Sequence, residues 1–202
     1  MSTPNSAATL RLTASQTIGP FFSPAILRED ARRNVLTQAE TVGERIRIEG
    51  RVFDGDHQPV NDALIEIWQA NAHGRYNHPA DQGTAPLDPT FLGFGRSGSD
   101  ETGSYWFETI KPGSIPFDGA QAQMQAPHIC VTVFSRGMLN HAVTRLYFAD
   151  EPSNSRDPIL QLVPSERRPT LLAQPVQSSS SLPVYRFDII LQGENETAFF
   201  NL

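Results

Sequence analysis

Residues 111–130 read KPGSIPFDGAQAQMQAPHIC and contain a turn, a loop rich in Gly, Ala and Gln, and the start of a strong strand. That strand continues to residue 134 as HICVTVF. In a strand, side chains two residues apart point to one face, so His128 and Cys130 share a face and Ile129 points to the other. A His-x-His pair would offer two metal ligands here, but the second position is a cysteine. Whether Cys130 makes or removes a metal site decides the function.

Alternation of apolar and polar residues with a period of two recurs along the chain and predicts an all-β fold. Strands are expected over residues 44–53, 63–69, 104–110, 128–134, 143–148, 184–191 and 197–200, with Gly-, Pro- and Asp-rich turns between them. This pattern of short strands predicts an antiparallel β-sandwich with a few short helices.

The remaining segments are expected to be less regular. A short surface helix is expected within residues 25–39, and Asp157-Pro158 is a good start for another. Residues 80–99 and 174–183 are expected to be irregular.

Length and composition indicate a globular protein in one domain. The 202 residues are expected to form a single domain over 1–202, with residues 1–15 as an extended arm. The formal net charge of -6 argues against nucleic acid as a partner. One cysteine, no apolar leader and no long apolar run predict a cytoplasmic protein without a membrane partner.

Residue chemistry alone does not indicate a ready-made site. None of the five histidines has a partner at H-x-H or H-x₃-H spacing. Cys130 lies between apolar residues and is interpreted as a buried, inert thiol rather than a nucleophile. Arg136 follows an apolar strand and precedes Gly137, so its guanidinium either binds a carboxylate or is solvated in a turn.

Four segments, taken in order, resemble the intradiol ring-cleaving dioxygenases. They are EIWQAN at residues 66–71 with GRY at 74–76; GR at 95–96 with GSYWF at 103–107; TIKPG at 109–113; and PHI at 127–129 with RLYF at 145–148. Their order and spacing match the family over roughly residues 15–200, which is nearly the whole chain.

The resemblance implies a non-haem Fe(III) that is held by two tyrosines and two histidines. Tyr76 matches the first tyrosine and His128 the first histidine. Ile115 stands at the second tyrosine position, Cys130 at the second histidine position, and Gln125 replaces an arginine of the family. Two of the four ligands are therefore absent, so the site is expected to be vestigial and the chain to bind no metal of its own.

The same pattern resembles the α chains of two-chain family members, which pair with a homologous β chain that carries the Fe(III). The resemblance implies an active site at the α/β interface within a larger hetero-oligomer. Thr17, Gly19, Pro20 and Arg136 match the α-chain residues that line it, and no catalytic residue is expected in this chain. The implied reaction is O₂-dependent cleavage of 3,4-dihydroxybenzoate to 3-carboxy-cis,cis-muconate in the β-ketoadipate pathway.

Two other functions stay open from the sequence. One is a self-sufficient dioxygenase with an altered metal site. The other is a structural or ligand-binding β-sandwich subunit without a catalytic role.

Overall fold

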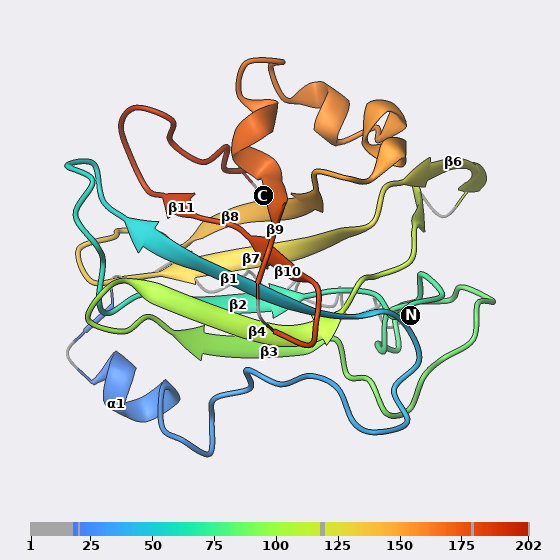
Figure 1. Ribbon diagram of the computed structural model, residues 1–202, viewed down its shortest axis with the longest axis horizontal. Coiled ribbons are helices and arrows are strands. Elements are labelled where there is room, and N and C mark those ends of the chain that lie inside the picture. Colours follow the sequence, from blue (N-terminus) through green and yellow to red (C-terminus); the bar gives the residue numbers. More distant parts are fainter. Residues whose placement is uncertain (1–17, 20, 118–119, 179, 202) are drawn as a thin grey trace, which may run out of the picture.

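The computed structural model describes residues 18–19, 21–117, 120–178 and 180–201, and it confirms the all-β fold (Figure 1). The strands of this part are β1 (Arg45–Phe53), β2 (Leu64–Trp68), β3 (Phe94–Gly98), β4 (Ser104–Ile110), β5 (Ile115–Phe117), β6 (Ala120–Gln125), β7 (His128–Phe134), β8 (Ala142–Phe148), β9 (Leu172–Val176), β10 (Val184–Arg186) and β11 (Ile189–Ile190). The described helices are the short α1 (Phe22–Ile26) and the 3-10 helices η1 (Pro152–Arg156), η2 (Leu160–Leu162) and η3 (Arg168–Leu171). None of them is long and apolar enough to cross a bilayer.

The strands form two layers of one continuous, mixed sheet. One layer runs β3-β2-β7-β8 and the other runs β4-β1-β10-β9. The parallel pairing of β8 with β9 joins the two layers at one edge. Strand β1 also pairs in parallel with β10 and β11, whereas the remaining pairings between these strands are antiparallel. The hairpin β5–β6 forms a separate two-stranded sheet.

The core lies between the two layers and follows from the alternation of the strands. Ile129, Val131 and Val133 of β7 face inward, as do Ile46 and Ile48 of β1, and all five are buried. Burying an aliphatic side chain of this size contributes about 1.5–3 kcal/mol. A second, smaller cluster around Tyr147 is covered by the 3-10 helices, which lie over β8 (Figure 1). Strand β8 is thus packed on both faces, with Leu146 and Phe148 in the main core and Tyr147 in the second cluster.

Asp157 connects the start of β7 to its neighbours. Its buried carboxylate accepts hydrogen bonds from Ala126 N at 2.7 Å, Tyr147 Oη at 3.1 Å and Leu160 N at 2.7 Å. The helix expected to start at Asp157-Pro158 is not present in that form: a turn follows Asp157, and the short 3-10 helix η2 begins only at Leu160. A buried carboxylate that several donors satisfy fixes the local geometry.

Several expected boundaries differ from the structure. The helix expected within residues 25–39 is replaced by α1, which begins earlier and ends at Ile26. Residues 80–99 were expected to be irregular, but they contain β3, which pairs with β2. The glycines of β3 interrupt the apolar alternation from which a strand is predicted. The expected irregular segment 174–183 begins inside β9.

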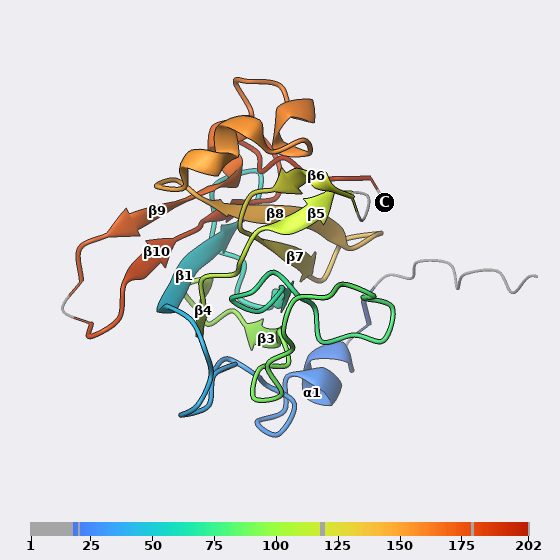
Figure 2. The ribbon, with the colours of Figure 1, turned by 90° about the vertical axis from the view of Figure 1, so that its right-hand side faces the viewer.

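The end of the chain also differs. Strand 184–191 is divided into β10 and β11. The strand expected over residues 197–200 was wrong, because only an isolated bridge joins Val143 to Phe200. In the loop before β7, the hairpin β5–β6 was not expected, since its residues are mostly Gly, Ala and Gln. Viewed from the end, this hairpin lies beside the loop that precedes β3 (Figure 2).

Candidate functional site

The first candidate site lies where β7 begins. Alternation places His128 and Cys130 on the face opposite the core residue Ile129, as expected. Cys130 pairs in register with Trp68 of β2 and with Arg145 of β8. The floor of the site is therefore a row of three side chains across β2, β7 and β8.

The loop that follows β2 brings Tyr76 over this floor. Buried Asn71 holds the loop, because its Oδ1 accepts hydrogen bonds from His73 N at 2.9 Å and Arg75 N at 3.1 Å. Gly74 is required in the loop, since it has a φ of +75° and a Cβ there would lie 2.0 Å from the backbone oxygen of Ser114. The Tyr76 ring then stacks on Trp68, with centroids 5.6 Å apart and planes 17° from parallel.

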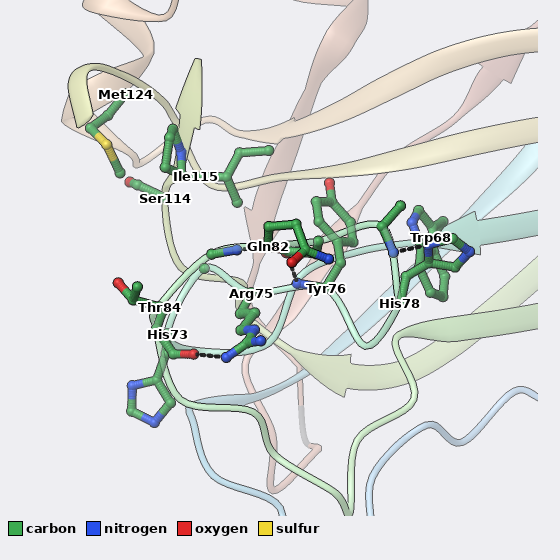
Figure 3. A pocket seen from close by; sticks show the side chains of 16 residues that line it. Trp68, His73, Arg75, Tyr76, His78, Gln82, Thr84, Ser114, Ile115 and Met124 are labelled. Atoms are coloured by element: carbon green, nitrogen blue, oxygen red, sulfur yellow. Dashed lines mark hydrogen bonds between the residues drawn. The ribbon is translucent and has the colours of Figure 1, made fainter. Parts of the chain in front are cut away.

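The structure brings the four expected positions to one end of the molecule. Tyr76 and Cys130 lie close enough for each to shift the pKa of the other. Ile115, from β5, lines the same cavity as Tyr76 (Figure 3). His128 Nδ1 donates to Ala126 O at 2.8 Å, so its Nε2 carries the free lone pair, and this buried atom has no hydrogen-bond partner.

Burial keeps the titratable groups of this end neutral. It raises the pKa of Tyr76 and the pKa of the Cys130 thiol. Burial and the nearby Arg145 guanidinium lower the pKa of His128 to about 4. At neutral pH the expected species are therefore a phenol, a thiol and an uncharged imidazole.

Arg145 is the residue of this site that sequence reasoning missed. Its Nη1 donates to Gln125 Oε1 at 2.7 Å, and it is close enough to Tyr76 and Cys130 to influence the pKa of each. Gln125, which replaces the family's arginine, therefore holds a guanidinium that comes from another strand. Gln125 ends β6 and Arg145 lies on β8, so this contact joins two strands that do not pair with each other, and the sequence alone does not give it.

The second candidate site lies at the other end of β7. Arg136 follows that strand in a turn, with its side chain 70% exposed. Its Nε forms an ion pair with Asp62 Oδ2, and Ser135 Oγ donates to Asp62 Oδ1 at 3.0 Å. A cavity of about 460 Å³ adjoins the turn. The guanidinium is thus paired at one nitrogen, and its other edge is available to an anion.

The N-terminal segment reaches this second end. Phe22 of α1 packs on Phe134 of β7, with ring centroids 5.8 Å apart, and Phe22 N donates to Gly19 O at 3.1 Å. Gly19 is exposed and lies on the same side as Arg136, whereas Thr17 and Pro20 fall outside the described residues. Figure 1 shows α1 and β6 at opposite ends of the molecule. The seven residues of β7 separate the two candidate sites by roughly 20 Å.

Comparison with known proteins identifies the family. A family model described as Dioxygenase matches residues 17–193. The chain is 40% identical over 204 residues to the protocatechuate 3,4-dioxygenase alpha chain of Burkholderia cepacia. The alignment covers 96% of this chain and 99% of the relative.

This chain belongs to the intradiol dioxygenase family.

Other relatives place the chain more broadly within this family. The beta chain of the same Burkholderia cepacia enzyme is also 40% identical, over 175 residues that cover 85% of this chain and 74% of the relative. Among solved structures, the dioxygenase domain of a dioxygenase carbohydrate-binding protein fusion from Streptomyces sp. SirexAA-E is 27% identical. It matches with a TM-score of 0.61 over 92% of this chain and 99% of that chain. Overall identity does not distinguish the alpha from the beta chain.

Intradiol dioxygenases use non-haem Fe(III), and the residues present here do not fit that ion. Ile115 has no donor atom, and Cys130 offers a thiol that is neutral because burial raises its pKa. Fe(III) is a hard ion that prefers oxygen and imidazole donors, and only Tyr76 and His128 offer them. The described residues contain no group of three His, Cys, Asp or Glu side chains that could hold a metal. We therefore derive no chemical step through iron in this chain.

The lowered pKa of His128 gives a test of its buried, neutral state. In the unfolded chain its pKa is about 6.5, so the unfolded state takes up the proton first as the pH falls. The free energy of unfolding should therefore decrease from pH 7.5 to pH 5, with about 2 kcal/mol of this decrease due to His128. Urea unfolding at the two pH values measures the change. The variant His128→Gln should lose this part of the pH dependence, whereas His141→Gln, at an exposed histidine, should keep it. Equal pH dependence in all three proteins would contradict a buried, neutral His128.

Proposed function

We propose that this chain is the α subunit of a protocatechuate 3,4-dioxygenase and that it binds no iron itself. The observation that carries the proposal is the pair Ile115 and Cys130 at two ligand positions, with the buried Cys130 thiol beside Tyr76. The alignments also support an α chain, because the match to the alpha relative covers 96% of this chain and the match to the beta relative covers 85%. We also propose that residues 1–202 belong to one domain; the arm expected over residues 1–15 lies outside the described residues.

The proposed partner is a homologous β chain that carries the Fe(III), and the two chains form a larger hetero-oligomer. The complex cleaves 3,4-dihydroxybenzoate between its two hydroxylated carbons. Both atoms of O₂ enter the product, 3-carboxy-cis,cis-muconate, so the equation balances without another reductant. The partner's iron supplies the redox chemistry, and this chain supplies part of the pocket. We expect the complex in the cytoplasm.

Arg136 is the residue of this chain that we assign to the substrate carboxylate. Its exposed guanidinium stands at the end of β7 beside a cavity, and Asp62 fixes its orientation through one nitrogen. The free edge then attracts and orients an anionic substrate in the partner's pocket. Gly19 lies on the segment that Phe22 anchors to the same end of β7, and Thr17 and Pro20 are proposed as further contacts.

Expression of the chain alone tests the proposal. The purified chain should contain far less than one iron per chain and should not turn over 3,4-dihydroxybenzoate. Addition of an iron-bearing β chain should produce activity above that of the β chain alone. Metal analysis and O₂ uptake measure both quantities. Stoichiometric iron together with activity in the lone chain would overturn the proposal.

Substitution of Arg136 tests its role within the complex. The change Arg136→Ala should raise KM for 3,4-dihydroxybenzoate by a factor that corresponds to about 1–3 kcal/mol, with a smaller effect on kcat. Steady-state kinetics measure the effect. Arg186→Ala is the matched control, because Arg186 is also an exposed, ion-paired arginine but lies on β10. Equal kinetics for the two variants would return Arg136 to the role of a solvated turn residue.

A further inference from the structure

Among the described residues, Asp62 supplies the carboxylate that pairs with Arg136, and strand register places it there. Strands β2 and β7 are antiparallel, and their last pair at this end joins Leu64 to Phe134. Two residues beyond that pair, Asp62 and Arg136 stand opposite one another, on the same face of the sheet as Leu64 and Phe134. The contact therefore follows from two core strands and not from the conformation of one turn.

The backbone on each side of Asp62 is held by Ser99. Ser99 Oγ donates to Val60 O at 2.7 Å and accepts a hydrogen bond from Ala63 N at 2.9 Å. Ser99 N in turn donates to Ala63 O at 2.9 Å. The side chain of Asp62 is only 19% exposed. Its carboxylate is therefore a preformed anchor at the start of β2.

The two oxygens of this carboxylate have different partners. Oδ1 accepts a hydrogen bond from Oγ of the buried Ser135 at 3.0 Å, and Oδ2 forms the ion pair with Arg136 Nε. Asp54, the other acidic residue that lines the adjoining cavity, accepts two backbone N–H groups of its own turn instead. Ser135 thus sets the rotation of the Asp62 carboxylate, and the carboxylate sets the plane of the guanidinium.

This contact leaves the outer edge of the guanidinium free. Within the described part of the chain, Nη1 and Nη2 of Arg136 form no hydrogen bond and no ion pair. A carboxylate binds such an edge through two parallel N–H···O bonds, which require the two planes to be aligned. A free arginine side chain visits many rotamers, and its ligand must select one of them. A contact that selects the rotamer in advance removes this cost from binding.

Asp62 has two opposing effects on an anion at this edge. Its negative charge offsets the charge of Arg136 and weakens the attraction, whereas its hydrogen bond orients the guanidinium. The Arg136 side chain is mostly exposed, so water and salt screen the effect of charge. Screening does not reduce the effect of orientation, and we therefore expect orientation to prevail.

We infer that Asp62 and Ser135 are positioning residues for the substrate carboxylate, and that they set the preference of the complex for 3,4-dihydroxybenzoate over catechol. Both act through Arg136, and neither contacts the substrate. The inference rests on the proposed function, because the carboxylate is the one assigned to Arg136 above. It deepens that function by assigning specificity to residues that lie behind the arginine.

The pairing itself can be measured in the full chain alone, without iron or substrate. In ¹H–¹⁵N spectra, the Arg136 Nε–H signal is assigned by its loss in Arg136→Lys. This proton should exchange with water more slowly in the unsubstituted chain than in Asp62→Ala. Asp62→Asn keeps an acceptor oxygen and should retain the slow exchange. Equal exchange rates in the unsubstituted chain and Asp62→Ala would overturn the inference, whatever the role of the chain in the complex.

Steady-state kinetics of the complex with an iron-bearing β chain test the effect on specificity. Asp62→Ala should raise KM for 3,4-dihydroxybenzoate by about tenfold, with little change in kcat. KM for catechol, which has no carboxylate, should stay unchanged. Asp62→Asn should stay within about threefold of the unsubstituted complex, and Ser135→Ala should lie between the two. Glu49→Ala is the matched control and should change neither KM, because Glu49 is also paired with an arginine but lies on β1.

A double variant separates positioning from a merely structural role. A structural role of Asp62 would affect both substrates alike and would persist without the arginine. In the Arg136→Ala background, Asp62→Ala should therefore cause no further change in KM for 3,4-dihydroxybenzoate.

Two results would overturn the inference and leave the proposed function intact. One is a ratio of the two KM values that changes in Arg136→Ala but not in Asp62→Ala. The other is an Asp62→Asn complex as impaired as Asp62→Ala, which would mean that charge and not orientation matters. An unchanged ratio in Arg136→Ala as well would remove the role of Arg136 together with the inference. A complex without any turnover would contradict the proposed function itself and, with it, this inference.

Discussion

The alternation of side chains along β7 is the constraint on which the rest of the structure depends. One face of this strand supplies Ile129, Val131 and Val133 to the core, which fixes the strand in the sandwich. Because that face is committed to the core, His128 and Cys130 must point to the other face. The same strand ends in the turn that carries Arg136. One buried strand therefore determines the direction of both candidate sites and the distance between them.

At the His128 end, the buried tyrosine, imidazole and thiol form an uncharged site at neutral pH. Tyr76 lies beside the thiol of Cys130, and burial disfavours its phenolate. Gln125 binds Arg145, which brings a guanidinium close to Tyr76 and Cys130. The buried carboxylate of Asp157 faces the same guanidinium.

The sequence predicted the parts of the fold that follow from local periodicity. Strands β1, β4, β7 and β8 alternate clearly, and they were found within a residue or two. The hairpin β5–β6 and strand β3 were missed because Gly, Ala and Gln carry no such signal, and their pairing with neighbours decides their structure. Residues 197–200, where a strand was expected, include apolar residues, but their pairing with β8 is a single isolated β-bridge between Phe200 and Val143.

The candidate sites show the same division between local and long-range information. Alternation was sufficient to place His128 and Cys130 on one face. The contacts of Cys130 with Tyr76, and of Gln125 with Arg145, depend on loop folding and strand register, which no local pattern encodes. The ion pair of Arg136 with Asp62 joins residues that are 74 positions apart, so it could not be read from the turn itself.

Anomalous X-ray diffraction at the iron edge, from crystals of this chain with its β partner, tests the central claim most directly. The account predicts an iron peak in the partner chain and none within about 2.5 Å of His128 Nε2, which is the reach of a metal–ligand bond. A full-occupancy iron peak between His128 and Tyr76 would contradict the account.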